Sequence, residues 1–269
     1  MTSTRKKKAT PPLRWADEPF QRFIDYTEEQ EKLLAVTIKG ISAFHGMPRL
    51  LEALHSLRDE SEVAGPEDKT WQKIKVAREQ AEFAKKQVET KFSDVYASAS
   101  VNMWTALETL VYDLFYASLK NDSGLMQQKP FSEVRVQVGD FVTLSDDQRT
   151  EVICREVEKL SKATYRPGIA KFESLLETIG LDGRVNKKTR RDIFELYHVR
   201  NLYVHKRGVV DFRFRENCPW KRTAVGNVLR INPRDYWRYA NSSYDYVFLV
   251  INRTRRKFGF RAYRHKKTS

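Results

Sequence analysis

A long apolar stripe in the middle of the chain limits what the chain can fold into. Apolar residues recur at steps of three and four from residue 77 to residue 117, and no proline or glycine occurs in the span 69–122. Steps of this size place side chains on one face of an α-helix. A helix this long either protrudes from a small bundle or is divided by a break near Phe92–Ser98. We therefore expect an all-α protein whose core includes the larger apolar groups of residues 101–119.

Helix-breaking and capping residues predict the ends of the other helices. Gly46-Met47-Pro48 is expected to divide a helical region over residues 13–61 in two. Further helices are expected to begin at Ser145, after Pro167-Gly168, at Asn186 and at Pro233. The residues between the last two favour β-structure, because residues 209–214 alternate like an edge strand and Gly226-Asn227 predicts a small β-hairpin over residues 223–231.

Composition divides the chain into three parts. Residues 1–12 are basic and poor in apolar groups, which predicts a disordered tail. Residues 13–90 are expected to form a helical N-terminal region, whose charged last stretch could serve as a coiled-coil arm. Residues 91–269 are expected to form the main helical domain, with the hairpin near its C-terminal end.

Positive charge is concentrated at the two ends of the chain. The net charge is +14, and residues 200–269 carry 18 Lys or Arg against four acidic residues. This C-terminal stretch is also rich in aromatic residues, and cations mixed with aromatics suit a polyanion with stackable bases. Aromatics in the core with a solvated charged face explain the composition equally well, so both interpretations stay open here.

Several classes of protein do not fit this sequence. No run of roughly 18 apolar residues occurs, so we expect no membrane-spanning helix and no membrane partner. Cys154 and Cys218 cannot build a disulfide framework or a four-ligand zinc site, and they are expected to be reduced thiols of a cytoplasmic protein. Glycine-rich phosphate loops and metalloprotease motifs are not found, so neither a metal nor another cofactor is expected.

One segment of the sequence carries residues suited to chemistry on RNA. Arg200 and His205 are five residues apart, and Asn201 directly follows the arginine. Cleavage of RNA by its own 2′-hydroxyl needs a base, an acid and positive charge at the phosphorane. Histidine serves the proton steps near neutral pH, and arginine binds phosphate oxygens through a planar fork. We therefore expect Arg200 and His205 to be catalytic, with Asn201 hydrogen-bonded to the phosphate or the imidazole.

Helical geometry places these groups unequally. Asn201 and His205 share one face of a helix, whereas Arg200 lies about 140° from His205 and must curl back or meet a histidine of another chain. The candidate RNA contacts are Lys206, Arg207 and His198, although a surface or supporting role is the favoured reading of His198. The carboxylates of Glu108 and Glu195 could orient Arg200 or the imidazole. Structural ion pairs are the alternative role for both.

The motif resembles the signature of the HEPN superfamily (higher eukaryotes and prokaryotes nucleotide-binding domains), many of whose members are ribonucleases. Residues 101–114, with an apolar stripe and an embedded acid, are similar to the first core helix of these domains. The resemblance covers about residues 92–214 and implies a HEPN-like bundle of four or five helices within residues 91–269, preceded by the long helical extension.

The resemblance also implies an activity and partners. It implies a metal-independent endoribonuclease in which two R-x4-H motifs face one cleft of a homodimer or a higher homo-oligomer. Members of this kind act as toxins or as antiphage effectors of abortive infection, so a regulatory partner protein is a further expectation.

Two other functions remain open from the residues alone. A non-catalytic HEPN-like module would bind RNA or a protein through its charged ends, and its RNA binding would depend strongly on salt without turnover. A DNA-binding regulator is less consistent with the sequence, since no helix-turn-helix with a basic recognition helix is evident.

Overall fold

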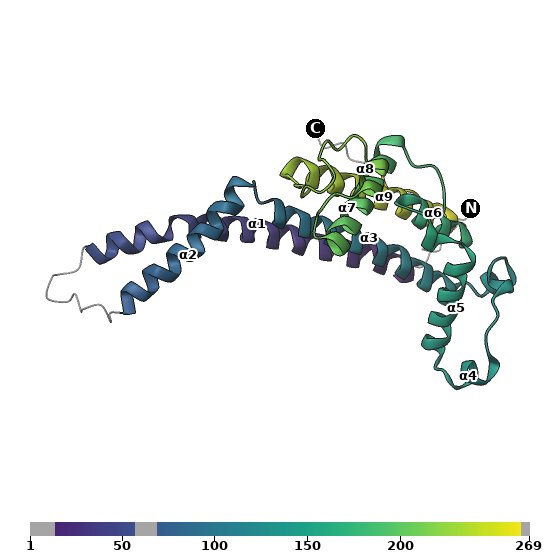
Figure 1. Ribbon diagram of the computed structural model, residues 1–269. Helices are drawn as coiled ribbons and strands as arrows, with labels where there is room; N and C mark the ends of the chain where they lie inside the picture. Colours follow the sequence, from purple (N-terminus) through teal and green to yellow (C-terminus); the bar gives the residue numbers. More distant parts are fainter. Residues whose placement is uncertain (1–13, 57–68, 265–269) are drawn as a thin grey trace, which may run out of the picture. The chain divides into compact units, whose positions relative to one another are not determined.

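The described part of the protein is built from helices joined by loops, of which residues 218–232 between the last two helices form a long one (Figure 1). A computed structural model describes residues 14–56 and 69–264, so the predicted tail at residues 1–12 lies outside the described residues. The longer helices are α1 (Arg14–Ser56), α2 (Lys69–Glu89), α3 (Ser93–Asn121), α5 (Asp146–Leu160), α6 (Ile169–Thr178), α7 (Lys187–Lys206) and α9 (Pro233–Lys257). The short ones are α4 (Val138–Thr143), α8 (Phe212–Asn217) and the 3-10 turns η2 (Ser123–Gln127), η3 (Phe131–Glu133) and η4 (Ala163–Tyr165). These residues contain no strand, which confirms the all-α class.

Packing divides the chain into two compact units, each made of separate stretches of sequence. The first unit holds the described residues up to Asp25, Leu107–Val185 and those from Tyr246 onward. The second holds Tyr26–Ala106 and Asn186–Asp245. Residues on both sides of the expected boundary at residue 90 therefore belong to the second unit.

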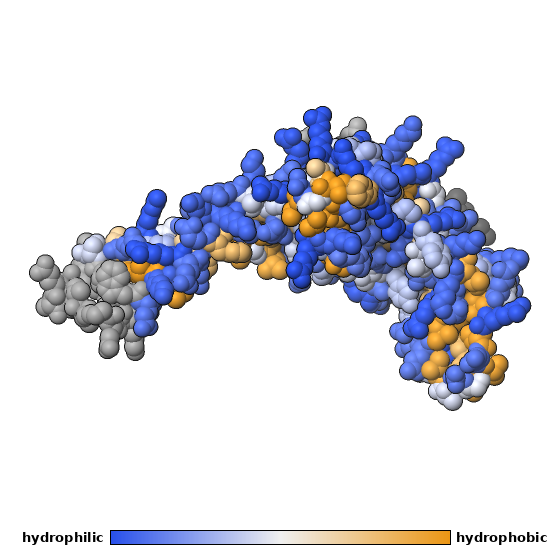
Figure 2. All heavy atoms as spheres, viewed as in Figure 1, coloured by the Kyte–Doolittle hydropathy of each residue, from blue (hydrophilic) through white to orange (hydrophobic). Residues whose placement is uncertain are grey.

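Aromatic rings and a half-buried carboxylate hold the first unit together. Phe172 of α6 stacks on Tyr246 of α9, with ring centroids 6.0 Å apart. Glu173 accepts a hydrogen bond from the Tyr246 hydroxyl at 2.8 Å and pairs with Arg253 at 2.9 Å. Figure 2 shows hydrophobic surface over α4 and α5, where Val138 and Val142 of α4 are exposed.

The second unit packs α7 against the first part of α3 and the first part of α9. Trp104 of α3 is fully buried and meets Tyr197 of α7 edge-on, with ring centroids 5.2 Å apart. Asp192 of α7 accepts a hydrogen bond from the Ser242 hydroxyl of α9 at 2.8 Å. Since α7 also carries the R-x4-H motif, these contacts fix the position of that motif.

Capping residues set the helix ends largely as predicted. Ser145 caps α5 in a reciprocal capping box with Gln148, and Asn186 caps α7 by accepting a hydrogen bond from the Thr189 amide at 2.9 Å. The last helix begins at Pro233, where proline lacks only an amide that would have no partner in the first turn.

The expected interruption of the first helix at Gly46-Met47-Pro48 is wrong, because α1 continues through these residues to Ser56. Proline inside a helix removes one hydrogen bond and costs about 3 kcal/mol. Beyond the proline, Glu52 of α1 pairs with Arg78 of α2 at 2.9 Å, but both side chains are exposed, so this pair offsets only about 1 kcal/mol or less of that cost. The helix continues in spite of the local signal.

The long apolar stripe is divided where a break was expected. Residues 90–92 separate α2 from α3, and both Lys91 (φ 55°) and Phe92 (φ 57°) adopt the left-handed conformation. The Phe92 amide donates to the carbonyl of Gln87 at 2.7 Å, which closes the end of α2.

The expected β-structure near the C-terminal end is wrong. Val209 and Val228 form a single antiparallel bridge, and no hairpin strands form over the described residues 223–231. The expected edge strand over residues 209–214 is replaced by α8, because the Asp211 carboxylate accepts a hydrogen bond from the Phe214 amide at 2.8 Å and starts a helix.

Candidate active site on helix α7

The C-terminal end of α7 reverses the chain and brings the next helix back onto it. Arg207 (φ 51°) and Gly208 (φ 80°) are both left-handed, and the Gly208 amide donates to the carbonyl of Leu202 at 3.2 Å. A Cβ atom on Gly208 would lie 3.0 Å from the Tyr203 ring, so glycine is required by both conformation and space. The turn positions Asp211 to cap α8 directly beside α7.

A pocket of about 410 Å³ opens between α7 and α8. It is lined by Tyr197, His198, Asn201, Leu202, His205, Lys206, Asp211, Arg213 and Phe214. The predicted sharing of one helix face by Asn201, His205 and His198 is thus confirmed. The His205 imidazole is exposed and forms no hydrogen bond within the described residues, so it is free to exchange protons with a ligand.

Arg200 reaches this pocket only through its neighbour. Its Nη1 donates to the Asn201 Oδ1 at 3.0 Å, while Arg200 itself does not line the pocket. The Nε of Arg200 is buried without a hydrogen-bond partner. In the single chain the Arg200 guanidinium reaches the amide of Asn201 and makes no hydrogen bond to His205.

His198 is buried in the wall of the pocket. It is only 6% exposed, and its ring lies against Phe194 (centroids 4.5 Å apart) and Tyr197 (5.0 Å). Burial, aided by the positive charge of Arg213 and opposed by Asp211, lowers the pKa of His198 to about 4. Its Nε2 is buried without a partner, so a neutral ring presents an unsatisfied nitrogen next to the pocket.

Two charged residues of the pocket were not singled out as site residues from the sequence. Arg213 is exposed and forms no ion pair within the described residues, and its charge faces His198 across the pocket. Asp211 caps α8 and lines the same wall. The turn at Gly208 brings both of them to α7, and no pattern in the sequence indicates where this turn directs the chain.

The remaining cationic candidates divide into two kinds. Lys206 lines the pocket and is exposed, as expected of a phosphate contact. Arg207 is exposed too, but it forms the left-handed C-cap of α7 and does not line the pocket.

Glu195 belongs to a buried ion network rather than to the pocket. Its carboxylate accepts hydrogen bonds from Arg238, Trp220 and the Tyr239 hydroxyl and pairs with Lys221 at 3.1 Å. Burial disfavours the charged form, but Arg238, Lys221 and Tyr239 outweigh it and lower the pKa of Glu195. The carboxylate therefore holds α7 against α9 and makes no hydrogen bond to Arg200 or His205.

Glu108, the other carboxylate predicted to support the site, also has a structural partner. It pairs with Lys171 at 2.7 Å, and both residues belong to the first unit. The structural alternative left open by the sequence is thus the one observed for both carboxylates.

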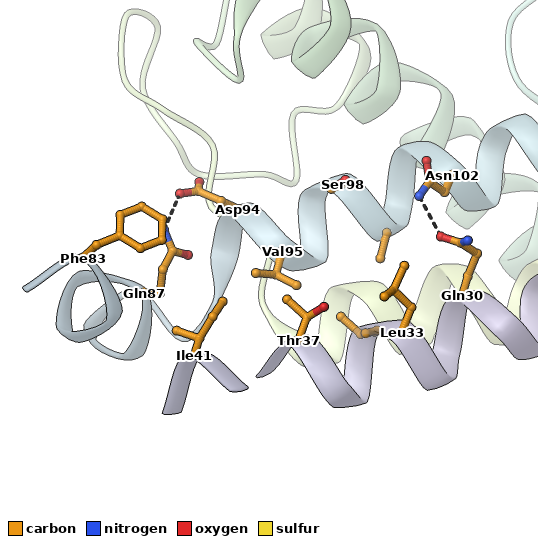
Figure 3. Close-up of a pocket in the computed structure, with 12 residues that line it drawn as sticks. Gln30, Leu33, Thr37, Ile41, Phe83, Gln87, Asp94, Val95, Ser98 and Asn102 are labelled. Atoms are coloured by element: carbon orange, nitrogen blue, oxygen red, sulfur yellow. Dashed lines mark hydrogen bonds between the residues drawn. The ribbon is translucent and has the colours of Figure 1, made fainter. Parts of the chain in front are cut away.

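A second pocket has a different character. It has a volume of about 380 Å³ and lies between α1, α2 and the start of α3, with apolar walls that include Leu33, Ile41 and Phe83 (Figure 3). The Asn102 amide donates a hydrogen bond to the Gln30 amide oxygen at 2.8 Å, and the Gln87 amide donates to the Asp94 carboxylate at 3.0 Å. No histidine or cation lines it, so it lacks the groups that phosphate chemistry requires.

Metal and membrane features are also missing from the ranges that the structure covers. Those ranges hold no cluster of His, Cys, Asp and Glu that could bind a metal ion, and no helix among them is long and apolar enough to cross a membrane. Burial raises the pKa of both thiols, Cys154 and Cys218, to about 12, which makes them poor nucleophiles.

Comparison of the chain with models of known families, with curated proteins and with solved structures gave no match. The function is therefore argued from the pocket on α7 and its residues.

Proposed function

We propose that the protein is a metal-independent endoribonuclease of HEPN type, which cleaves RNA at the pocket on α7. One observation carries this proposal: His205, Asn201, Lys206 and Arg213 converge on one pocket, and among the described residues its wall holds a single carboxylate, Asp211. His205 can exchange protons, and Lys206 and Arg213 are cations without an ion pair in the described residues. Phosphodiester cleavage by an internal hydroxyl requires groups of these two kinds.

The residues have distinct tasks in this reaction. His205 accepts the proton of the RNA 2′-hydroxyl, whose oxygen then forms a bond to the adjacent phosphorus. The bond from phosphorus to the 5′-oxygen breaks, and that oxygen takes a proton from an acid. The products are a 2′,3′-cyclic phosphate and a 5′-hydroxyl. Lys206 and Arg213 neutralise the charge that accumulates on the phosphorane oxygens.

A second copy of the chain supplies the acid in this proposal. The buried His198 has a pKa of about 4 and is neutral near pH 7, so it is a hydrogen-bonding group rather than an acid. The R-x4-H motif resembles that of HEPN ribonucleases, which pair their motifs across a dimer, and a second His205 would then donate the proton. The same resemblance supports a homodimer or higher homo-oligomer in the cytoplasm, acting as a toxin or antiphage effector under a regulatory partner.

A non-catalytic RNA- or protein-binding module is the second candidate. It is favoured by the placement of Arg200, which touches Asn201 and does not line the pocket. In that case the arginine is a structural residue and the cations alone bind the ligand.

The test is cleavage of end-labelled transfer RNA and of a mixed-sequence RNA in the presence of EDTA. Wild type is expected to cleave both, leaving cyclic phosphate ends, and His205→Ala is expected to reduce the rate at least 100-fold. His45→Ala, which removes an exposed histidine of α1, is the matched control and should behave as wild type. Undiminished cleavage by His205→Ala would contradict the mechanism, and salt-sensitive binding without cleavage by wild type would favour the binding module.

A further inference from the structure

A third pocket lies at the opposite end of α7 from His205. It has a volume of about 530 Å³ and is lined by Lys187, Lys188 and Arg191 of α7, together with Trp220, Lys221 and Arg238 and two carboxylates. All of its residues belong to the second unit, as does the pocket that contains His205. The catalytic proposal makes no use of it.

The charges in this pocket separate into a paired inner set and a free outer set. The inner cations, Lys221 and Arg238, are bound to buried or half-buried carboxylates, as in the Lys221–Asp235 pair at 2.6 Å. The outer cations, Lys187, Lys188 and Arg191, are exposed and form no ion pair in the part of the chain that the structure covers. Three positive charges are therefore available to a ligand, and the two carboxylates of the wall are already neutralised.

An aromatic platform lies among the free cations. The Arg191 guanidinium is stacked over the Trp220 ring, 4.3 Å from its centroid. The indole is held in place because its Nε1 donates to the buried carboxylate of Glu195. A guanidinium plane or an indole is a surface on which a nucleobase stacks, and lysines next to it suit the phosphates.

Geometry relates this platform to the catalytic pocket. Arg191, His198 and His205 follow one another at steps of seven residues, so they lie along one stripe of α7. At 1.5 Å per residue, Arg191 and His205 are about 21 Å apart along the helix axis. Stacked nucleotides rise roughly 3.4 Å each, so about six of them span this distance.

We propose that the pocket formed by Lys187, Lys188, Arg191 and Trp220 binds single-stranded RNA, stacking one base on the Arg191–Trp220 platform and contacting the adjoining phosphates with the lysines. The second part of the inference rests on the proposed function: the same RNA strand runs along α7, so that its scissile bond reaches His205. A stacked RNA strand shorter than about six nucleotides cannot occupy both pockets.

Binding is measured first, in the His205→Ala background, so that the result does not depend on cleavage. Fluorescence anisotropy with labelled 12-nucleotide and 4-nucleotide RNAs is recorded over a series of salt concentrations. Arg191→Ala is expected to raise the Kd for the 12-mer about tenfold because the stacking platform is lost, and to leave the slope of log K against log salt, which counts phosphate contacts, nearly unchanged. Lys187→Ala combined with Lys188→Ala should reduce the slope by about 1.4.

Two further variants distinguish binding at this pocket from general electrostatic attraction of RNA to the protein. Arg190→Ala removes an equal charge from an exposed neighbour that does not line the pocket, and it should leave the Kd within about twofold of the parent. Arg191→Lys keeps the charge without the planar platform, so it should keep the salt slope and still weaken binding. A circular dichroism melt of each variant checks that the helices are retained.

The outcomes for the pocket and for the nuclease can be told apart. Unchanged binding in Arg191→Ala, or an equal loss in Arg190→Ala, would overturn the pocket even if wild type cleaves RNA. Loss of binding confined to Arg191→Ala, together with no cleavage by wild type, would uphold the pocket and reject the nuclease. If both hold, Arg191→Ala should raise the KM for the 12-mer and leave that for the 4-mer unchanged.

Discussion

The Arg200 guanidinium donates to the Asn201 amide oxygen at 3.0 Å, and Asn201 in turn lines the same pocket as His205. Within the described residues, Asn201 is therefore the hydrogen-bonded link between the arginine and the pocket. We predict that Asn201→Ala lowers kcat/KM for RNA cleavage 10- to 100-fold, since a charge-assisted hydrogen bond is worth about 1.5–3 kcal/mol. Single-turnover cleavage measures the effect, with Asn121→Ala at the exposed end of α3 as the control. Wild-type kinetics in Asn201→Ala would show that the link is not used.

The buried ring of His198 makes stability depend on pH. Its pKa is about 4 in the folded protein and 6.5 when unperturbed, so between these values the unfolded chain binds a proton that the folded chain does not. Stability is therefore fully present above about pH 6.5 and falls as the pH falls toward 4. We expect a loss of about 2 kcal/mol from this residue between pH 7 and pH 5. Urea unfolding at the two pH values should show a smaller difference for His198→Phe than for wild type, and equal differences would contradict the assignment.

The carboxylate of Glu195 is predicted to be essential for stability. It is 1% exposed and accepts hydrogen bonds from Arg238 and Tyr239, so its loss leaves buried donors and cations without their partner. We expect Glu195→Gln to lower the free energy of unfolding by about 3–5 kcal/mol, as in other broken buried pairs. Urea titration measures this, and the exposed Glu216 provides the control substitution Glu216→Gln, which should change stability by less than about 0.5 kcal/mol. A small effect of Glu195→Gln would mean that the network is dispensable.

Two glycines allow backbone strain to be separated from steric clash. Gly208 (φ 80°) and Gly226 (φ 86°) share the left-handed conformation, but a Cβ atom would meet Tyr203 at 3.0 Å only at Gly208. Gly226→Ala should cost about 1–2 kcal/mol for conformation alone. Gly208→Ala should cost more and should also reduce RNA cleavage, because the turn that brings Arg213 to α7 is displaced. Equal stability of the two variants would remove the steric argument.

Local signals in the sequence were sufficient for much of the fold. Asn186 and Ser145 start helices because their side chains satisfy free amides within their own turn, which needs no information from distant residues. The continuation of α1 through Pro48 and the formation of α8 were not predictable in this way. In the first case the structure does not follow a helix-breaking signal, and in the second a capping bond competes with an alternating pattern.

The site was predictable to the extent that one helix determines it. Asn201 and His205 share a face because four residues make about one helical turn, and the pocket brings them together. Arg213 and Asp211 reach the pocket through the turn at Gly208, whose direction depends on the Tyr203 ring and on pairing with residues 226–229. The rotamer that turns Arg200 toward Asn201 likewise depends on its surroundings rather than on spacing.

The joint between α2 and α3 depends on two residues in an unfavourable backbone conformation. Lys91 and Phe92 each hold a conformation that costs an L-residue roughly 1–2 kcal/mol, while the apolar stripe continues through the joint without a change of period. The joint is held against that cost by the buried apolar face of α2, which includes Ile74, Ala77 and Ala84, and by the hydrogen bond from the Gln87 side chain to Asp94 at 3.0 Å. Glycine at position 91 should therefore relieve part of the strain without changing the packing of α2.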